Sequence, residues 1–233
     1  MALKRFYREA SAESEAAQHH VALDGRPVRT PEKALLILPT RRLAAAIAEE
    51  WDAQTDEIRP DSMPMTQLAS TAIDRVRPRR EEIVDSIAAY AGTDLLCYRA
   101  DGPSALVERQ AAHWQPLLDW AALQFDAPLS VTDGIVPVEQ PADAVASIRR
   151  AVADGDEFTY AGLYNLTVAC GSVVMALAVR EGEIDAAQAC HASQLDESWQ
   201  AEQWGEDPEA AARRERIRGD IHAATRFLDL LKG

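Results

Sequence analysis

The first forty residues carry short apolar runs separated by turn residues, which is a β pattern. The runs lie at 5–7, 20–23, 26–30 and 34–38. Asp24-Gly25 stands between two of them, and an Asp-Gly pair in this position predicts a tight hairpin. Pro27 has no N–H to give to a neighbouring strand, so its strand is expected at a sheet edge or a strand start. The pattern predicts a small antiparallel sheet.

From Thr40 onward the apolar period changes from that of strands to that of helices. Apolar side chains recur three and four residues apart, which places them on one helical face. The helices predicted on this basis lie at 43–54, 65–73, 83–91, 106–125, 158–179 and 217–231. Thr40 is the expected N-cap of the first helix, and Gly92 is expected to stop the third. Pro116 should kink or restart its helix, because it removes one backbone hydrogen bond.

Residues 158–179 contain no charged residue, and this length could cross a bilayer. Tyr164, Asn165 and Thr167 interrupt the hydrophobicity, however, and no basic cluster flanks the segment to orient it. We interpret it as a buried central helix and expect no membrane insertion. The final helix should pack on it. Gly171-Ser172 falls inside the expected helix, where a hydroxyl normally bonds back to the backbone.

Composition places the chain among ordinary globular proteins. It has 233 residues, of which 47% are hydrophobic and 27% charged, enough for one large domain or two small ones. We assign it to the α+β class, with a small N-terminal antiparallel β domain at 1–39 followed by a larger, mainly α-helical domain at 40–233. The formal net charge of −14 argues against nucleic acid and anionic membranes as partners.

The usual signatures of catalysis and cofactor binding are missing from the sequence. It contains no G-x-x-x-x-G-K-[ST] loop and no G-x-G-x-x-G turn, so we expect no nucleotide binding. Cys190 and His191 are adjacent, and neighbours on a helix point about 100° apart, so they are not expected to form a catalytic pair. The histidines lack metal-ligand spacing. We predict no catalytic residue, no metal and no cofactor.

Two features suggest a cytoplasmic protein. The three cysteines, Cys97, Cys170 and Cys190, are too few and too dispersed for a disulfide framework, which fits a reducing compartment. The first fifteen residues lack the apolar core of a signal peptide, and their acidic residues argue against an organellar presequence. We expect a bacterial cytoplasmic location.

Acidic residues are concentrated near the C-terminal end. Nine of them fall in a stretch without Lys or Arg: Glu181, Glu183, Asp185, Asp196, Glu197, Glu202, Glu206, Asp207 and Glu209. Such a run is usually a solvated face. The arginines that follow, Arg213, Arg214, Arg216 and Arg218, are expected to pair with some of these acids.

The acidic stretch also contains aromatic residues at helical spacing. In a helix through 195–204, Glu197, Gln200 and Trp204 share one face together with Ser193, whereas Leu195 and Trp199 share the other. One face can enter the core. The other combines a carboxylate, an amide and an indole, which is typical of protein recognition surfaces. The candidate partner-binding residues are Asp196, Glu197, Gln200 and Trp204.

Several ordered motifs resemble those of the ATP synthase assembly chaperones that escort the alpha subunit. They are Leu23–Val28, Ala48–Gln54, Met63–Thr66, Thr93–Arg99, Arg109-Gln110 with Trp114 to Trp120, and Leu195–Glu197 through Trp204-Gly205. Each motif is short, but together they span most of the chain in the order expected for that family.

The resemblance implies a non-enzymatic chaperone with a small N-terminal β domain and a larger helical domain. Such a protein binds free alpha subunit of the F-type ATP synthase until the beta subunit replaces it. In that family an acidic residue within the stretch that matches Leu195–Glu197 is important for function. Asp196 and Glu197 are both candidates, and the helical face favours Glu197.

Two other functions remain open from the residues. A small acidic hydrolase would use a carboxylate pair drawn from Asp196, Glu197 and Glu202 as general acid and base, which requires that they converge in a pocket. A helical adaptor for some other protein is the second alternative.

Overall fold

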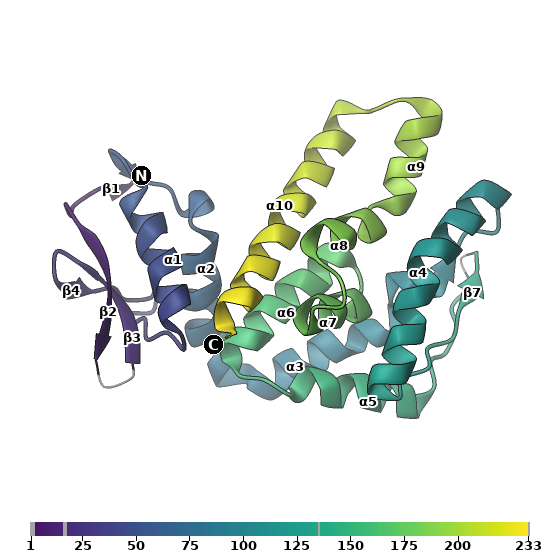
Figure 1. The fold of residues 1–233 in the computed structure, drawn as a ribbon, viewed down its shortest axis with the longest axis horizontal. Helices are drawn as coiled ribbons and strands as arrows, with labels where there is room; N and C mark the ends of the chain where they lie inside the picture. Colours follow the sequence, from purple (N-terminus) through teal and green to yellow (C-terminus); the bar gives the residue numbers. More distant parts are fainter. Residues whose placement is uncertain (1–2, 16–17, 135, 233) are drawn as a thin grey trace. The chain divides into compact units, whose positions relative to one another are not determined.

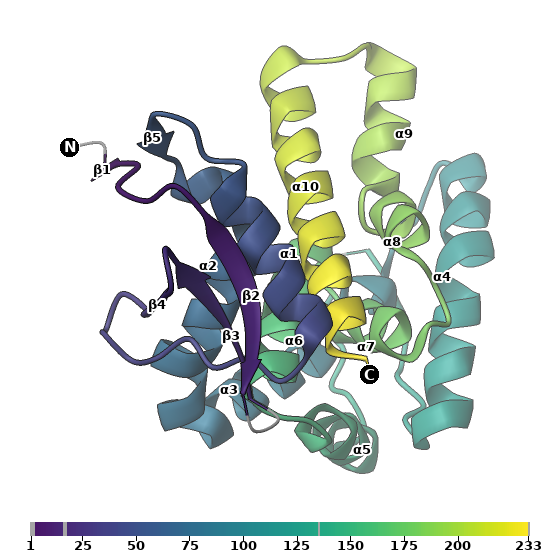
Figure 2. The same cartoon turned by 60° about the vertical axis from the view of Figure 1, so that its left-hand side comes forward.

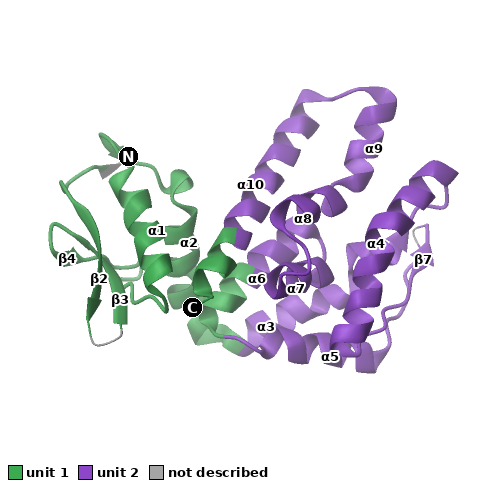
Figure 3. Ribbon diagram, viewed as in Figure 1, with its two compact units in different colours: residues 1–80, 156–162, 226–233 green, residues 81–155, 163–225 purple. Residues whose placement is uncertain are grey.

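The computed structural model describes residues 3–15, 18–134 and 136–232 of the chain (Figure 1). Its contacts divide the chain into two compact units. The first unit contains residues 1–80, 156–162 and 226–233, and the second contains residues 81–155 and 163–225 (Figure 3). Helices α6 (Glu157–Cys170) and α10 (Pro208–Leu231) contribute to both units.

The first unit is built on a three-stranded antiparallel sheet in the order β2-β3-β4. Its strands are Ala10–Glu15, Gln18–Leu23 and Arg26–Pro27. The turn between β3 and β4 has positive φ at both Asp24 (48°) and Gly25 (75°), as a two-residue hairpin requires. The predicted hairpin is therefore confirmed, and Pro27 lies on an edge strand, as expected.

Other strand predictions need correction. Residues 5–7 have irregular backbone, and the short strand β1 (Leu3–Lys4) before them pairs with β5 (Glu57–Ile58). The expected strand at 34–38 forms isolated bridges instead, one between Leu38 and His19 of β3 and one between Leu35 and Arg29. Strand β2 has the sequence Ala-Ser-Ala-Glu-Ser-Glu and is mostly exposed. The pattern of apolar runs did not predict β2, because its sequence carries no large apolar residue.

Helix α1 (Arg41–Asp52) packs on β2 and β3, and Figure 2 shows it running alongside β2. It begins where the sequence predicted, because the Thr40 hydroxyl accepts a hydrogen bond from the Leu43 N–H at 3.1 Å. Helix α2 (Pro64–Thr71) follows, and a π-helical turn (Ala72–Val76) extends it. The core of this unit includes Val21, Leu43 and Ile47, which are fully buried.

The second unit is mainly helical. It contains α3 (Arg80–Ala88), α4 (Ser104–Phe125), α5 (Ala142–Ala153), α7 (Val173–Glu181), α8 (Ala186–Ser193) and α9 (Leu195–Trp204), together with parts of α6 and α10. A short parallel pair joins β6 (Tyr98–Arg99) to β7 (Thr132–Asp133). The observed architecture, an antiparallel sheet followed by a mainly helical region, confirms the predicted α+β class.

One prediction about helix continuity was wrong. The segment 158–179 is not one helix, because Gly171 adopts a left-handed φ of 66° and ends α6. Ser172 then caps α7, and its hydroxyl accepts from the Met175 N–H at 3.0 Å. Helix α4 does not restart at Pro116, because it continues from Ser104 to Phe125. Buried Trp114, Leu117 and Leu118 on either side hold it in place, which offsets the lost backbone hydrogen bond.

The buried interpretation of the uncharged segment is confirmed for α7, since every residue of 173–179 is buried. It holds only in part for α6, where Tyr164 is 39% and Val168 48% exposed. The predicted packing of the last helix is also confirmed, because Leu228 lies directly against Gly162 of α6. None of the helices in the described parts of the chain has the length and hydrophobicity that crossing a bilayer requires.

The contacts divide the chain at a different place from the predicted boundary between residues 39 and 40. The unit that contains the sheet continues to Arg80, because α1 packs on β2 and β3 and α2 packs on α1. The same unit also takes in two later segments of the chain.

Candidate functional site

The acidic C-terminal region forms α8, α9 and the first part of α10. Gln194 interrupts the helical path with φ −110° and ψ 21°, so α8 ends at Ser193 and α9 starts at Leu195. Ser193 is buried and belongs to α8. It therefore does not share the predicted face of α9, because that expectation assumed one continuous helix.

The remaining residues of the predicted face are exposed. Glu197, Gln200 and Trp204 all lie on the solvent side of α9, and Trp204 is 79% exposed at its last position. On the other side, Leu195 is buried and Trp199 is half-buried. The division of α9 into an exposed polar and aromatic face and an inner apolar face is the one expected from the sequence.

Asp196 differs from its neighbour Glu197 because a buried side chain binds it. Its carboxylate accepts a hydrogen bond of 2.7 Å from the Gln110 amide of α4. Gln110 is itself only 1% exposed, and its carbonyl oxygen accepts the Ala100 N–H at 2.8 Å. Asp196 is therefore held by the helical core, whereas the Glu197 side chain extends into solvent.

A second contact fixes α9 against α4. The Arg109 guanidinium lies 2.8 Å from the Glu202 carboxylate and 4.8 Å from the centre of the Trp199 ring. The arginine thus joins an ion pair to a cation–π contact, and its hydrogen bond lowers the pKa of Glu202. Sequence spacing did not point to Arg109 or Gln110, although both belong to a motif of the chaperone resemblance.

The predicted pairing between arginines and acids occurs at Arg214 of α10. Arg214 donates to the Glu197 carbonyl oxygen at 3.2 Å and forms an ion pair with Glu206. These contacts tie α9 to α10, and Figures 1 and 2 show the two helices side by side as a hairpin. The arginine therefore supports the backbone from which the Glu197 carboxylate projects.

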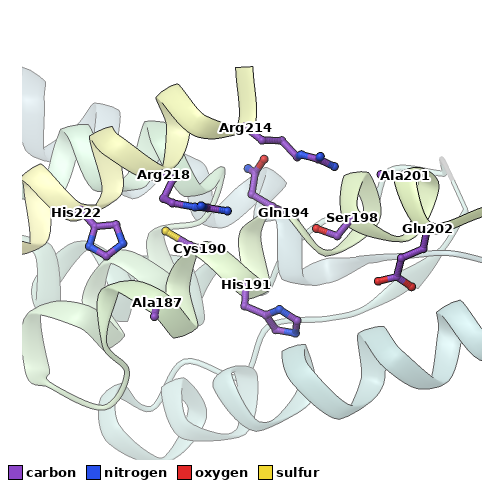
Figure 4. A pocket seen from close by; sticks show the side chains of 10 residues that line it. All are labelled: Ala187, Cys190, His191, Gln194, Ser198, Ala201, Glu202, Arg214, Arg218 and His222. Atoms are coloured by element: carbon purple, nitrogen blue, oxygen red, sulfur yellow. The ribbon is translucent and has the colours of Figure 1, made fainter. Parts of the chain in front are cut away.

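Two grooves flank this hairpin. The α8–α10 groove has a volume of about 560 Å³ and is lined by Cys190, His191, Gln194, Arg214, Arg218 and His222 among others (Figure 4). A second groove, of about 430 Å³, is lined by Asp196, Glu197, Val168 and Ile217 among others.

The three acids considered for a hydrolase do not line one pocket. Glu202 lines the α8–α10 groove, whereas Asp196 and Glu197 line the second groove. Asp196 is bound to Gln110 and Glu202 to Arg109. Glu202 therefore does not converge with Asp196 and Glu197. Those two acids line one groove, but Gln110 already binds the Asp196 carboxylate, so a pair of unengaged carboxylates is not observed among these three residues.

His191 contacts a residue other than Cys190. The Nε2 atom of His191 lies 3.4 Å from that of His113 on α4. Burial raises the pKa of the Cys190 thiol, which disfavours the reactive thiolate. Among the described residues, no three His, Cys, Asp or Glu side chains lie close enough together to hold a metal ion.

Comparison with known proteins defines the class of this molecule as a chaperone. The sequence pattern of the family described as "ATP12 chaperone protein" matches residues 4–122. The mitochondrial protein atp12 of Schizosaccharomyces pombe is 24% identical over 214 residues, which cover 87% of this chain and 74% of that protein.

Solved structures agree over nearly the whole chain. The crystal structure of Atp12 from Paracoccus denitrificans has a TM-score of 0.94 and 43% identity, and 99% of each chain is covered. A mutant of that protein, with lysine in place of an aspartate, gives a TM-score of 0.94 at 42% identity and covers 99% of this chain and 98% of its own. The chain belongs to the ATP12 chaperone family, which confirms the resemblance found in its motifs.

Proposed function

We propose that this chain is a chaperone for assembly of the F-type ATP synthase catalytic sector, and that it binds free alpha subunit until the beta subunit replaces it. Membership of the ATP12 family supports the chaperone role. The observation that carries the binding role is the exposed face of α9. There a 79% exposed tryptophan, Trp204, stands beside the exposed residues Glu197 and Gln200.

An unassembled subunit exposes a partly apolar interface, and a protein that masks it needs apolar anchors and polar groups. Tryptophan is among the residues that contribute most to such contacts. Trp204 serves as the anchor, while Glu197 and Gln200 supply a charge and an amide on the same face. Asp196, held by Gln110, positions the start of the helix and lines the second groove.

In this proposal the protein acts by binding and release, and it performs no chemical step. Release requires moderate affinity, so that the beta subunit displaces the chaperone by competition. Such a function needs no cofactor, and it places the protein in the bacterial cytoplasm, where the subunits are made.

The first test is co-purification of the tagged chain with separately expressed alpha subunit from the same source. The expected result is a complex that excess beta subunit displaces. If folded alpha subunit is not retained, or if added beta subunit joins without displacing the chain, the proposal is wrong. An unrelated tagged helical protein provides the background control.

Two pairs of variants locate the contact. Glu197→Lys and Trp204→Ala are expected to weaken the complex about tenfold or more, since each removes a central contact. Glu139→Lys reverses an exposed charge away from α9, and Leu123→Ala removes an apolar side chain that is 88% exposed on α4. These matched controls should bind as the wild type does. Equal losses in test and control variants would assign the contact elsewhere.

A further inference from the structure

The α8–α10 groove has a local charge opposite to that of the chain as a whole. The formal net charge of the protein is −14, yet Arg214, Arg218 and His222 all line this groove (Figure 4). They follow one another at four-residue intervals on α10. Their backbone positions are therefore about 6 Å apart along one face of the helix.

The acids that pair with these arginines lie outside the groove. Arg214 binds Glu206, and Arg218 binds Glu215 at 3.1 Å. Both carboxylates are mostly exposed, at 61% and 70%, and such exposed pairs stabilise weakly and exchange readily. Among the described residues that line the groove, Glu202 is the one carboxylate, and Arg109 already binds it. The groove therefore presents more donors than acceptors.

Gln194, by contrast, requires a hydrogen-bond donor. It lines the groove, and its Oε1 atom is buried without a hydrogen-bond partner among the described residues. A buried acceptor without a donor is costly, and an N–H group that enters the groove relieves the cost once the amide turns toward it. A polypeptide carries such N–H groups, whereas inorganic phosphate or a free carboxylate ion does not.

We infer that the α8–α10 groove binds an acidic segment of a partner polypeptide. Two carboxylates one helical turn apart pair with Arg214 and Arg218, and an N–H of the segment reaches Gln194. The volume of about 560 Å³ and the small side chains of Ala187 and Ala201 leave room for such a segment. The inference rests on the proposed function only in taking the partner to be the alpha subunit.

The direct test uses a fluorescein-labelled peptide that carries Glu-Ala-Ala-Ala-Glu, with fluorescence anisotropy as the readout. Arg218→Glu should weaken its binding about tenfold or more, because a charge-assisted hydrogen bond becomes a repulsion. Arg216→Glu makes the same charge change on α10 at a residue outside the groove lining, and should change affinity less than about twofold. Arg218→Gln tests the site with a smaller perturbation, and circular dichroism verifies the fold of each variant.

Three results would overturn the inference. The first is an equal loss in Arg216→Glu, which would mean that the peptide senses only the general field of α10. The second is equal binding of a peptide with glutamine in place of both glutamates. The third is complete displacement of the peptide by millimolar inorganic phosphate, which would assign the groove to small anions.

Co-purification with alpha subunit separates this inference from the proposed function. If wild type retains alpha subunit and Arg218→Glu retains it equally well, the groove is not the contact and the chaperone proposal stands. If wild type retains no alpha subunit, the chaperone proposal fails, and the peptide titration still decides whether the groove binds acidic segments.

Discussion

Glu50 of α1 binds the first turn of α2 through Thr66. Its carboxylate accepts the Thr66 N–H at 2.8 Å and the Thr66 hydroxyl at 2.7 Å, and its other oxygen accepts the Met65 N–H at 2.7 Å. A carboxylate at a helix N-terminus satisfies donors that have no partner within the helix. Ala48–Gln54 and Met63–Thr66 are two of the motifs that identified the family, so this part of the family signature is structural.

Removing this cap should destabilise the first unit. We expect Glu50→Ala to lower the free energy of unfolding by about 2 to 4 kcal/mol, because it leaves buried N–H groups without an acceptor. The neighbouring Glu49→Ala removes only an exposed pair with Arg226 at 3.6 Å and should cost less than about 1 kcal/mol. Urea denaturation of both variants makes the comparison, and similar losses would contradict the capping role.

Asp94 should make stability fall as the pH rises. This fully buried carboxyl accepts N–H groups from Leu96 at 3.1 Å and Val174 at 3.2 Å, and burial raises its pKa from 3.8 to about 6. Between these values the folded protein holds a proton that the unfolded chain has released. The contribution of Asp94 is therefore greatest below pH 4 and decreases, by up to about 3 kcal/mol, as the pH rises through 6.

The matched variant for this test is Asp94→Asn, which keeps the shape and removes the titration. Subtracting its free energy of unfolding from that of the wild type cancels the other carboxylates. The difference should decline between about pH 4 and 6 and then remain constant. A flat or rising difference would contradict the raised pKa of Asp94.

Gly162 should not tolerate a side chain. A Cβ atom at this position would lie 2.6 Å from Leu228 Cδ2 and 2.8 Å from Leu228 Cγ. We expect Gly162→Ala to cost about 1 to 3 kcal/mol through overpacking. Gly219, on α10, has open space around it, so Gly219→Ala should raise stability by up to about 1 kcal/mol. Thermal unfolding measures both, and a stabilised Gly162→Ala would mean that α6 and α10 are less tightly packed.

We expect Gln110 to fix the position of the Asp196 carboxylate without itself contacting a partner protein. In a double-mutant cycle with Gln110→Ala and Asp196→Ala, the two residues should couple by about 1 kcal/mol in the free energy of unfolding. Glu197→Ala should show no coupling to Gln110→Ala, since its side chain points to solvent. Coupling of equal size for both acids would contradict the difference between anchored and exposed carboxylates.

Local patterns predicted the helices better than the strands. The cap at Thr40 and the apolar period of α1 are properties of neighbouring residues, so they are readable from sequence. Strand β2 is not, because its pairing with β3 compensates for a sequence with little β propensity. The helix break at Gly171 was also not predicted, because apolar residues continue with the same period on both sides of this glycine.

The candidate site also has one part that the sequence predicted and one part that it did not. The exposed face of α9 followed from helical spacing, and the structure places Glu197, Gln200 and Trp204 on it. The contact between Gln110 and Asp196 joins residues 86 positions apart, and no local spacing can indicate such a pair. Both residues belong to the sequence motifs, but the motifs do not indicate which residue has a structural role and which contacts a partner.

The first unit takes some of its contacts from the far end of the chain. Thr40 donates its hydroxyl hydrogen to the Leu230 carbonyl at 2.6 Å, across a separation of 190 residues. Ribosomes add about 5 to 20 residues per second, so roughly 10 to 40 seconds pass between the synthesis of these two residues. The N-terminal end of α1 thus lacks this hydrogen bond until the last turn of α10 has been synthesised, so during translation this chaperone is itself an incomplete protein.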